Sequence, residues 1–440
     1  PAPESNWKSL DLSTWPAYQY PKPDLDKPPY AVAVDLGTTH IRLSFWDRQQ
    51  QTRIASRHGN NPQVALGEDV LTRLDVHRQR SQDLQSLTDI VRDAIINGIR
   101  DILARDIGEI KSILDKVGLV NIVGNTAMLA LVSGQDGSQL YQPENWENHI
   151  PCIANDIDAW KQAWHIPNAD IEIQAPLAGF IGSDILAGLM AINMTQTVEP
   201  VLFADFGTNT EIALWDGKKI WLSSVPGGPA FEGVGLQHGL SADAGAIRSV
   251  SKNNGLFVLD IIGMDTAKGF CASGFVDAIA LLLTSHDIKL SGRFTHPSPE
   301  GFLLDKNNPH TSIKPRDIDA FQRAKAATAA AMQQLLELAG ISTDNLGELW
   351  ICGAFGQHLN LQNAQITGLL PTMDSSRIQL FGNAALSGCE KMILNPDAKN
   401  RIEALRQLVH VVNLSHYPEY DEYFINHLRL KPFIGGEDRK

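Results

Sequence analysis

Cysteine is scarce in this sequence, and the few cysteines form no recognisable pattern. The 440 residues include only Cys152, Cys271, Cys352 and Cys389, and no two of them make a CxxC pair. Such wide spacing encodes neither a disulfide scaffold nor a local zinc or iron–sulfur site. We therefore expect all four to be small, buried side chains without a redox role.

Long apolar runs and excess positive charge are missing as well. No run reaches the roughly 18 to 20 residues that a membrane-spanning helix needs, and the N-terminus does not read as a secretory signal. We expect a cytoplasmic protein that binds no membrane. The formal net charge of −13 is spread along the chain. This disfavours nucleic-acid binding, because phosphates would be repelled.

The composition is that of a globular protein that can bury one or two substantial cores. Hydrophobic residues make up 43% of the chain and charged residues 20%, so two domains are expected. Residues 1–29 carry seven prolines and two tryptophans, the composition of a semi-rigid linker docked by a few aromatics. Because the sequence starts at Pro1, we expect it to begin partway into a longer polypeptide.

From residue 30 onward the sequence contains the same succession of elements twice. YAVAVDLGTTHIRLSFWD reads as two strands joined by a turn, and QQTRIAS as a third strand. A helix, the strand GLVNIVG, the helix NTAMLALVSG, a strand near Ile171 and a helix from Ser183 follow. The order β-β-β-α-β-α-β-α returns from VLFADFG to NAALSGCEKMIL, interrupted by insertions that include a loop-rich region from about Ser291 to Lys314.

An internal repeat of this size predicts an α/β protein with two similar lobes. We place the first lobe at residues 30–197 and the second at 198–440, facing each other across a cleft. Each lobe would contribute one acidic hairpin to a shared site.

The two hairpins carry the first candidate catalytic residues. A carboxylate ends the first strand of each, Asp35 in AVDLGTTHI and Asp205 in FADFGTNTEI. Because carboxylates repel phosphate, we expect these two to hold a hydrated Mg²⁺ or to orient a water molecule. A single Asp-x-Gly-Thr is more often a structural turn. Two at corresponding places of a repeat favour function.

The turns that follow predict a phosphate clamp. Glycine permits a tight turn and removes the Cβ that would block a ligand, while hydroxyls, an amide and turn N–H groups can bind phosphate oxygens. The expected nucleotide-binding residues of the two turns are Gly37, Thr38, Thr39, Gly207, Thr208 and Asn209.

Two further glycine clusters complete the candidate site. ICGAFGQHLN follows a strand, and Gly353 and Gly356 would let the backbone lie flat against an adenine ring; close helix–strand packing is the alternative. In PGGPAFEG, Gly227 and Gly228 form a bend before Glu232. Glu232 could position water in the cleft, but a surface or capping glutamate fits equally well.

Two histidines also fall in these segments. His238 follows the PGGPAFEG bend and His358 follows the GAFG turn. An isolated histidine more often packs or caps than binds a ligand, so we expect a structural role for both.

These elements resemble the phosphate-1, phosphate-2 and adenosine motifs of the ASKHA superfamily, which contains acetate and sugar kinases, Hsp70 and actin. This resemblance implies a duplicated actin-like or Hsp70-like, RNase H-like ATPase fold with two lobes around a nucleotide cleft. Longer segments, among them VGNTAMLALVSG, CASGFVDAIALLL, RDIDAFQRAKAA and GAFGQHLNLQNAQITGLLP, are similar to the reductive activators of corrinoid-dependent methyl-transfer enzymes.

That family resemblance implies an ATPase that returns inactive Co(II) corrinoid to Co(I), using ATP, Mg²⁺ and a ferredoxin-type electron donor. Its partner would be the corrinoid protein of a methyltransferase system, and a homodimer is expected. Family members usually carry an N-terminal 2Fe-2S domain, so here the cluster is expected only in a separate or upstream domain. A small-molecule kinase and a nucleotide-dependent scaffold are the alternatives.

Overall fold

Two compact units make up this protein, which we describe from a computed structural model. The structure describes residues 7–10, 20–21, 28–65, 83–142, 146–148, 150–207, 209–227, 231, 235–296, 298, 300–353, 355 and 358–434. The first unit comprises Pro1–Met194 with Asn383–Leu408, and the second comprises Thr195–Gly382 with Val409–Lys440. The expected boundary after residue 197 lies close to the first crossing. The sequence did not indicate that residues 383–408 return to the first unit.

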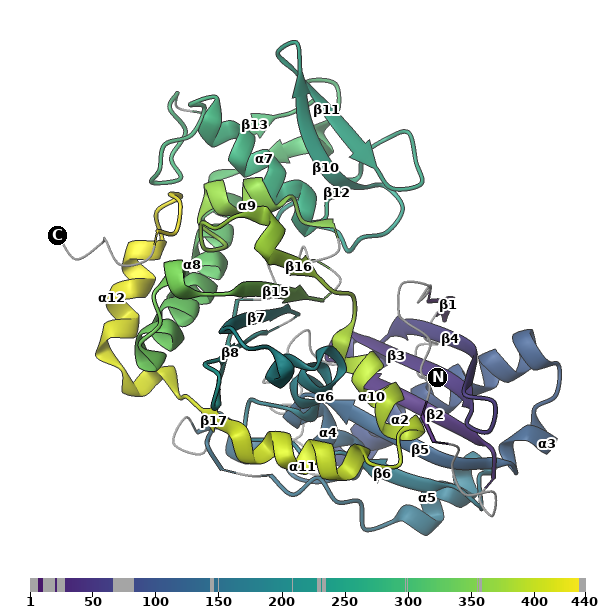
Figure 1. Cartoon of the computed structure of the whole chain (residues 1–440). Coiled ribbons are helices and arrows are strands. Elements are labelled where there is room, and N and C mark those ends of the chain that lie inside the picture. The colour runs from purple at the N-terminus through teal and green to yellow at the C-terminus, as the bar shows by residue number, and fades with distance from the viewer. Residues whose placement is uncertain are drawn as a thin grey trace. The chain divides into compact units, whose positions relative to one another are not determined.

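The sheet of the first unit forms around its acidic hairpin (Figure 1). In spatial order its strands are β1 (Lys8–Ser9), β4 (Thr52–Asn60), β3 (His40–Asp47), β2 (Tyr30–Leu36), β5 (Val117–Gly124) and β6 (Asp170–Ile173). Strands β2, β3 and β4 are antiparallel because tight turns join them, whereas β5 and β6 run parallel to β2 because helical crossovers precede them.

The sheet of the second unit repeats this topology. Its order is β16 (Ile378–Leu380), β15 (Glu348–Cys352), β7 (Val201–Phe206), β8 (Thr210–Trp215), β9 (Ile220–Val225) and β17 (Val409–Val411). If the five strands of each repeat are numbered along the chain, their spatial order is 3-2-1-4-5 in both sheets. The duplication predicted from the sequence is therefore confirmed. Each sheet also has one short extra strand beyond its third, β1 in the first unit and β17 in the second.

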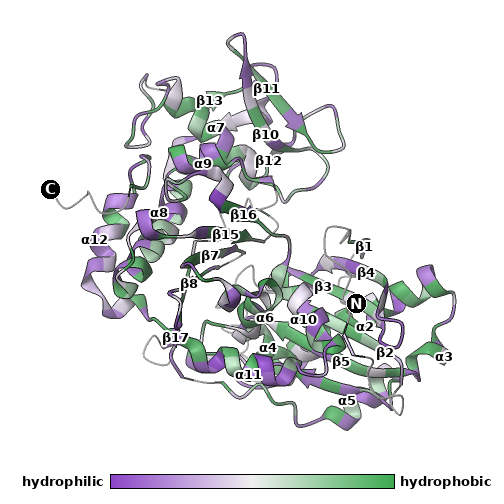
Figure 2. Ribbon diagram, in the orientation of Figure 1, coloured by the Kyte–Doolittle hydropathy of each residue, from purple (hydrophilic) through white to green (hydrophobic). Residues whose placement is uncertain are grey.

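Helices cover both faces of the first sheet. They are α2 (Asp83–Ile102), α3 (Lys111–Leu114), α4 (Thr126–Ser133), α5 (Ile157–Trp164), α6 (Ser183–Ile192), α10 (Ala384–Leu394) and α11 (Ala398–Leu408). Along β2, Val32 and Val34 belong to the core that contains α2 and α4, whereas Ala31 and Ala33 belong to the core that contains α6 and α10. A strand buried on both faces is mostly apolar, which Figure 2 shows for the central strands, and Asp35 is the charged exception in β2.

Small residues let α6 and α10 pack closely in the first unit. A Cβ added at Gly388 would lie 2.0 Å from the carbonyl oxygen of Ala187, and one added at Gly188 would lie 3.3 Å from the Cβ of Ala384. Side chains larger than glycine would therefore push the two helices apart. Because α10 also contacts β2 and β5, this packing explains why the C-terminal helix belongs to the first unit.

The second unit contains insertions between β9 and β15. A small sheet has the order β11 (Leu256–Ile261), β10 (Ala246–Asn253) and β12 (Gly269–Phe270), and the expected loop-rich region contains the short strands β13 (Phe302–Leu303) and β14 (Ser312–Ile313). The helices of this unit are α7 (Ala272–Thr284), α8 (Pro315–Ala339), α9 (Leu361–Thr367) and α12 (Pro418–His427). One hydrophobic core joins them to the larger sheet.

Part of the N-terminal segment docks on the first unit. Strand β1 pairs antiparallel with β4, and Trp7 is 9% exposed. The Trp7 ring lies where a side chain at Gly59 or Gly98 would stand, since an added Cβ would approach it to 3.1 Å and 2.7 Å. Trp7 is therefore one aromatic side chain that docks the N-terminal segment on the first unit.

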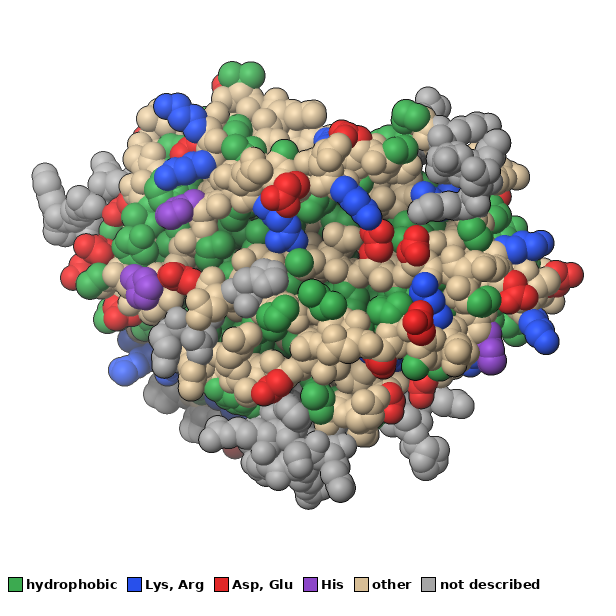
Figure 3. Space-filling model, turned by 90° about the horizontal axis from the view of Figure 1, so that it is seen from below, with side chains coloured by type: hydrophobic (Ala, Val, Ile, Leu, Met, Phe, Trp, Pro, Cys, Tyr) green, Lys and Arg blue, Asp and Glu red, His purple; other side chains and the backbone are tan. Residues whose placement is uncertain are grey.

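Surface charge and hydropathy agree with the composition. Figure 3 shows one face on which acidic and basic side chains are interspersed among hydrophobic and neutral ones. Within the described ranges, no helix combines the length and apolar character required to cross a membrane.

Candidate functional site

The first hairpin positions Asp35 near the end of β2, where neighbouring groups already bind it. Its carboxylate is 5% exposed and accepts hydrogen bonds from Arg42 Nη1 at 3.3 Å and from Asn383 Nδ2 at 2.6 Å. Arg42 stands directly opposite Asp35 on β3, and Asn383 caps α10. The negative charge of Asp35 is thus balanced within the first unit, and Asp35 fastens α10 to the hairpin.

Glycine is required in the turn after Asp35. The N–H of Gly37 donates to the carbonyl oxygen of His40 at 3.0 Å. A Cβ added at Gly37 would lie only 2.7 Å from that same oxygen, so any other residue would open the turn.

Two asparagines hold this turn in place. Asn61 donates from its backbone N–H to the Thr39 oxygen at 2.8 Å and from Nδ2 to the Gly37 oxygen at 3.0 Å. Asn125 donates from Nδ2 to the Thr38 hydroxyl at 2.9 Å, and its side-chain oxygen caps α4. Thr38 is 4% exposed. Neither asparagine was predicted from the sequence, although an asparagine directly before TAMLALVS is a helix-capping signal.

The N-terminus of α6 lies beside that of α4. The N–H of Gly124 donates to the hydroxyl of Ser183 at 3.3 Å, and a Cβ added at Gly182 would approach the Cα of Asn125 to 2.5 Å. Asp184 follows in the first turn of α6 and is partly exposed. Helix N-termini carry partial positive charge, so the surroundings of the Thr38 turn favour an anion.

The second hairpin has the same outline but different charges. Asp205 on β7 stands opposite Glu211 on β8, with Cys352 beside it on β15. The N–H of Gly207 donates to the Asn209 oxygen at 3.0 Å, which closes the turn. Thr208 lies outside the described residues.

The two carboxylates therefore differ in what they can bind. Asp35 faces a guanidinium, whereas Asp205 faces a second carboxylate. Like charges directly opposite each other on neighbouring strands are destabilising, and a cation between them relieves the repulsion. Oxygen ligands of this kind are those that Mg²⁺ prefers. Glu211 also accepts a hydrogen bond from the Ser224 hydroxyl at 3.1 Å, and it was not predicted from the sequence.

Backbone conformation and close packing both require glycine at position 353. Its φ of +90° lies in the left-handed region that favours glycine. An added Cβ would lie 2.4 Å from the carbonyl oxygen of Phe206 and 3.0 Å from Oδ1 of Asp205. The end of β15 thus abuts the hairpin end of β7. The expected contact of Gly353 with an adenine ring stays a prediction, and Gly356 lies outside the described residues.

The PGGPAFEG bend approaches α8 at Gly227. A Cβ added there would lie 3.0 Å from the carbonyl oxygen of Ala324 and 3.3 Å from the hydroxyl of Thr328. Gly228 and Glu232 lie outside the described residues, so their expected roles stay predictions.

A pocket of about 550 Å³ opens between this bend, α8 and α12. Its lining residues are Pro226, Gly227, Gly235, Ala320, Arg323, Ala324, Ala327, Tyr420, Asp421 and Phe424. Burial, assisted by Asp421, raises the pKa of Tyr420 to about 12, so its hydroxyl keeps its proton at neutral pH. Of the expected nucleotide-binding residues that are described, only Gly227 lines this pocket.

The histidines and cysteines offer no metal site within the described residues. Burial lowers the pKa of His238, aided by His310, and likewise that of His358, aided by Arg248. All four cysteines are buried and unpaired, and burial raises the pKa of Cys152 to about 12. Across the described ranges, no three His, Cys, Asp or Glu side chains are grouped so as to hold a metal ion.

Comparison with known proteins places the chain in a family. Family models for the RACo middle region and for the C-terminal ASKHA domain of RACo match residues 30–197 and 199–433. The chain belongs to the RACo family. The two matched regions meet close to the first crossing between the compact units.

Individual members of the RACo family match along most of the chain. The corrinoid activation enzyme RamQ of Eubacterium limosum is 28% identical, with 92% of this chain and 71% of RamQ covered. The Co(II) methylated amine-specific corrinoid protein reductase of Methanosarcina barkeri is 24% identical, with 88% and 73% covered. A solved reductive activator for corrinoid iron–sulfur protein superposes with a TM-score of 0.79 at 25% identity, covering 93% of this chain and 67% of that one. The two-lobed ATPase-type fold expected from the sequence is confirmed.

Proposed function

We propose that this protein is an ATP-dependent reductive activator that returns the Co(II) of a corrinoid methyl-transfer protein to Co(I). The observation that carries this proposal is the match of the two RACo models, which together span the chain from residue 30 to residue 433. The names of the RamQ enzyme and of the amine-specific reductase support corrinoid activation as the reaction. The acidic hairpins of the two sheets support ATP as the energy source.

The second hairpin is the proposed magnesium side of the ATP site. Asp205 and Glu211 would hold Mg²⁺, which neutralises charge on phosphate oxygens when it is bound. The N–H groups and side chains of the turn at Gly207 and Asn209 would bind those oxygens. Thr208, Gly228, Glu232 and Gly356 remain sequence predictions for the same site.

The first hairpin has a different proposed role. Asp35 is engaged by Arg42 and Asn383, so it would fix the turn and orient water rather than bind metal directly. The Thr38 and Thr39 turn and the N-terminus of α4 would bind phosphate oxygens. Both Asp35 and Asp205 thus stay candidate catalytic residues, with a metal ligand proposed only at Asp205.

The electron in this reaction needs a donor outside the described residues. Reduction adds one electron to Co(II), and a reduced 2Fe-2S cluster that supplies it is oxidised in turn. The buried single cysteines do not fit a cluster of this kind. We therefore assign the donor role to a ferredoxin-type protein or domain. The expected homodimer, the cytoplasmic location and the lack of nucleic-acid or membrane binding stay predictions.

Anaerobic absorption spectroscopy tests the proposal. The corrinoid protein in the Co(II) state is mixed with this chain, a reduced 2Fe-2S ferredoxin and MgATP. The Co(II) spectrum should convert to that of Co(I), and omitting either ATP or the chain should prevent the conversion. Conversion at the same rate without ATP would overturn the proposal. ATP-dependent phosphorylation of a small molecule without any cobalt change would favour a kinase instead.

A further inference from the structure

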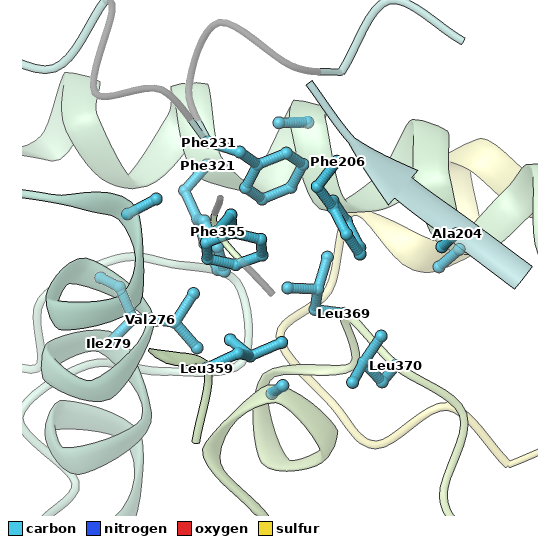
Figure 4. Packing of buried hydrophobic residues seen from close by; sticks show 14 of the residues in the cluster. Ala204, Phe206, Phe231, Val276, Ile279, Phe321, Phe355, Leu359, Leu369 and Leu370 are labelled. Atoms are coloured by element: carbon cyan, nitrogen blue, oxygen red, sulfur yellow. The ribbon is translucent and has the colours of Figure 1, made fainter. Parts of the chain in front are cut away.

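Three phenylalanines come from three different segments that the sequence assigns to ATP binding. Phe206 lies between Asp205 and the Gly207 turn, Phe231 directly precedes Glu232, and Phe355 lies between Gly353 and Gly356. Figure 4 shows the three rings gathered in one group, although they are separated by many residues in the chain.

The rings contact one another pairwise. The centroids of Phe206 and Phe231 are 5.3 Å apart at 85°, and those of Phe206 and Phe355 are 5.1 Å apart at 71°, both edge-to-face arrangements. Phe231 and Phe355 are stacked at 5.3 Å and 24°. Each ring is therefore in contact with both of the others. Edge-to-face and stacked pairs at these distances add to the stabilisation from burial alone.

All three rings are buried in the core of the second unit. Their exposed fractions are 3% for Phe206, 4% for Phe231 and 7% for Phe355. Phe321 of α8 contacts Phe231 at a centroid distance of 6.3 Å. The same helix approaches Gly227, at the start of the bend that contains Phe231. The cluster is thus anchored on a long helix.

Such burial is unusual for segments that bind a ligand. Loops generally run over the surface and are more mobile than the strands they connect. Here Phe206, at the end of β7, and Phe231 and Phe355, outside the regular strands, each place one large aromatic side chain in the interior. A shift of one segment would break two ring contacts and open space in a close-packed core, so the three segments are held together.

The first hairpin has no such arrangement. Leu36 occupies the position that corresponds to Phe206, and the turn after it is fixed by hydrogen bonds from Asn61 and Asn125. Polar contacts alone would thus suffice to hold a turn. The aromatic group in the second unit does something more, because it joins three segments rather than fixing one.

We propose that Phe206, Phe231 and Phe355 act as positioning residues for ATP. Their mutual contacts set the end of β7, before the Gly207 turn, at fixed separations from residues 231 and 355, so that one ATP molecule can reach all three expected binding segments at once. None of the three rings needs to touch the nucleotide. The inference rests on the proposed function, because it assumes that these segments bind ATP.

The test compares ATP with its fragments. Phe231→Leu and Phe355→Leu each remove ring contacts while keeping the side chain apolar. Phe270→Leu is the control, because Phe270 is 1% exposed in the same core, pairs edge-to-face with Phe275 at 5.8 Å and lies in none of the three segments. Isothermal titration calorimetry gives the dissociation constants of MgATP, adenosine and tripolyphosphate, and thermal unfolding gives the Tm.

Both variants should weaken ATP binding by about tenfold or more, since misplacing the two halves of a site removes simultaneous contact. Adenosine and tripolyphosphate should bind within about twofold of the wild type, because each fragment needs only its own segment. Phe270→Leu should lower the Tm by a similar amount without changing ATP affinity.

Three results would overturn the inference. These are unchanged ATP affinity in both folded variants, equal losses for ATP and its fragments, and an equal loss in Phe270→Leu. If the variants do not fold, Phe355→Met serves as a milder change with the same expectation. Failure of the wild type to bind ATP would instead overturn the proposed function.

Discussion

Asp35 and Asp205 are equivalent in the repeat, yet their neighbours give them different chemistry. Asp35 accepts hydrogen bonds from Arg42 and Asn383, whereas Asp205 stands opposite Glu211 on the neighbouring strand. A carboxylate that is already paired with a guanidinium is a poor metal ligand. The pattern Asp-x-Gly-Thr could not reveal this difference, because the deciding residues lie on the neighbouring strand and on α10.

We expect Asp205→Asn to lower ATP turnover by about 100-fold or more while changing the dissociation constant of ATP by less than about tenfold. A metal-positioning carboxylate acts chiefly on charge that develops during phosphoryl transfer. Asp35→Asn, the matched variant, should lower ATP turnover through the loss of a water-orienting group and should also lower the Tm, because it leaves Arg42 without its carboxylate partner. Phosphate release assays and calorimetry give the two quantities. Wild-type turnover in Asp205→Asn would contradict the assignment.

Lys325 is a charged residue in an unusual place, because it is fully buried in α8. Its Nζ donates a hydrogen bond to the carbonyl oxygen of Arg429 at 2.8 Å. Burial, with a smaller contribution from Lys431, lowers the pKa of Lys325 to about 7 from 10.5. The neighbouring charge that shifts this pKa is thus a second cation and not a carboxylate. The sequence RDIDAFQRAKAA gave no sign of this, since lysine on a helix is usually exposed.

The pH dependence of stability should reflect Lys325. Between about pH 7 and pH 10.5 the unfolded lysine binds a proton that the folded lysine does not, so its contribution makes the free energy of unfolding rise with pH. Below about pH 7 both states are protonated and this slope disappears.

Lys325→Met should remove that slope. The variant should gain stability relative to the wild type at pH 7, by up to about 5 kcal/mol, and the gain should shrink toward pH 10. Urea unfolding at several pH values measures the difference, with the exposed Lys399→Met as the control. A difference that does not depend on pH would show that Lys325 keeps an ordinary pKa.

At the scale of elements, α10 is fastened to the first sheet by a buried ion pair. Glu390 is fully buried and accepts hydrogen bonds from Nε and Nη2 of Arg53 on β4, at 3.0 Å and 2.8 Å. Arg53 also lies over the ring of Trp46, 4.9 Å from its centroid. Burial raises the pKa of Glu390 although Arg53 opposes the shift, so desolvation outweighs the attraction.

Substituting one partner of this pair should therefore lower the free energy of unfolding more than replacing both partners with apolar residues. Glu390→Gln should lower the free energy of unfolding by about 3 kcal/mol, because Arg53 loses its charged partner in a mostly buried position. The double variant Arg53→Met with Glu390→Met should lie within about 1 kcal/mol of the wild type. Lys399→Met, which breaks the exposed pair with Glu172, should cost less than about 1 kcal/mol. A double-mutant cycle in urea that shows additive losses would contradict this view.

The sequence predicted most repeated elements because each has a strong local pattern. YAVAVDL became β2, and the helix expected from about residue 84 became α2. The strands β1 and β17 have two and three residues and form only because a partner strand is available, so no local pattern marks them. The largely buried α10 was predicted as a helix, but its docking on the first unit depends on Glu390 and Gly388, which meet residues far away in sequence.

The candidate site was predictable to a similar degree. Glycines and carboxylates at turns were visible in the sequence, whereas the asparagines and phenylalanines that hold those turns were not. Their partners come from other parts of the chain, as Asn61 does for Gly37 and Phe355 for Phe206. Gly353 had a visible pattern with two explanations, but its positive φ and its close approach to Phe206 could be seen only in the structure.

At the scale of the whole molecule, the N-terminal anchor alters how a tethered electron donor would behave. Residues 1–29 read as a linker that would let a donor placed upstream range widely. In the structure Trp7 is buried against the first unit, and Leu10 exchanges hydrogen bonds with Ser56. Only the six residues before Trp7 would then connect a fused domain to this anchor, a reach of about 20 Å.

An engineered fusion of a 2Fe-2S ferredoxin domain ahead of Pro1 tests this picture. The chain alone should show no iron–sulfur absorption and should not pass electrons to the corrinoid. The fusion should reduce Co(II) in an ATP-dependent way and faster than ferredoxin added at equal concentration, because tethering raises the effective concentration toward the millimolar range.

Trp7→Ala separates the anchor from the tether. In the fusion, releasing the anchor lengthens the connection to the 19 residues before Tyr20, which exchanges hydrogen bonds with Gln51, and the rate of Co(II) reduction should change severalfold as the donor samples a larger volume. With ferredoxin supplied separately, the same substitution should leave the rate unaltered, because no tether is involved. Stopped-flow spectroscopy under anaerobic conditions measures both rates. Equal effects of Trp7→Ala in the two arrangements would show that the anchor acts through the stability of the first unit, and a chain that reduces cobalt unaided would show that one of its own cysteines carries electrons.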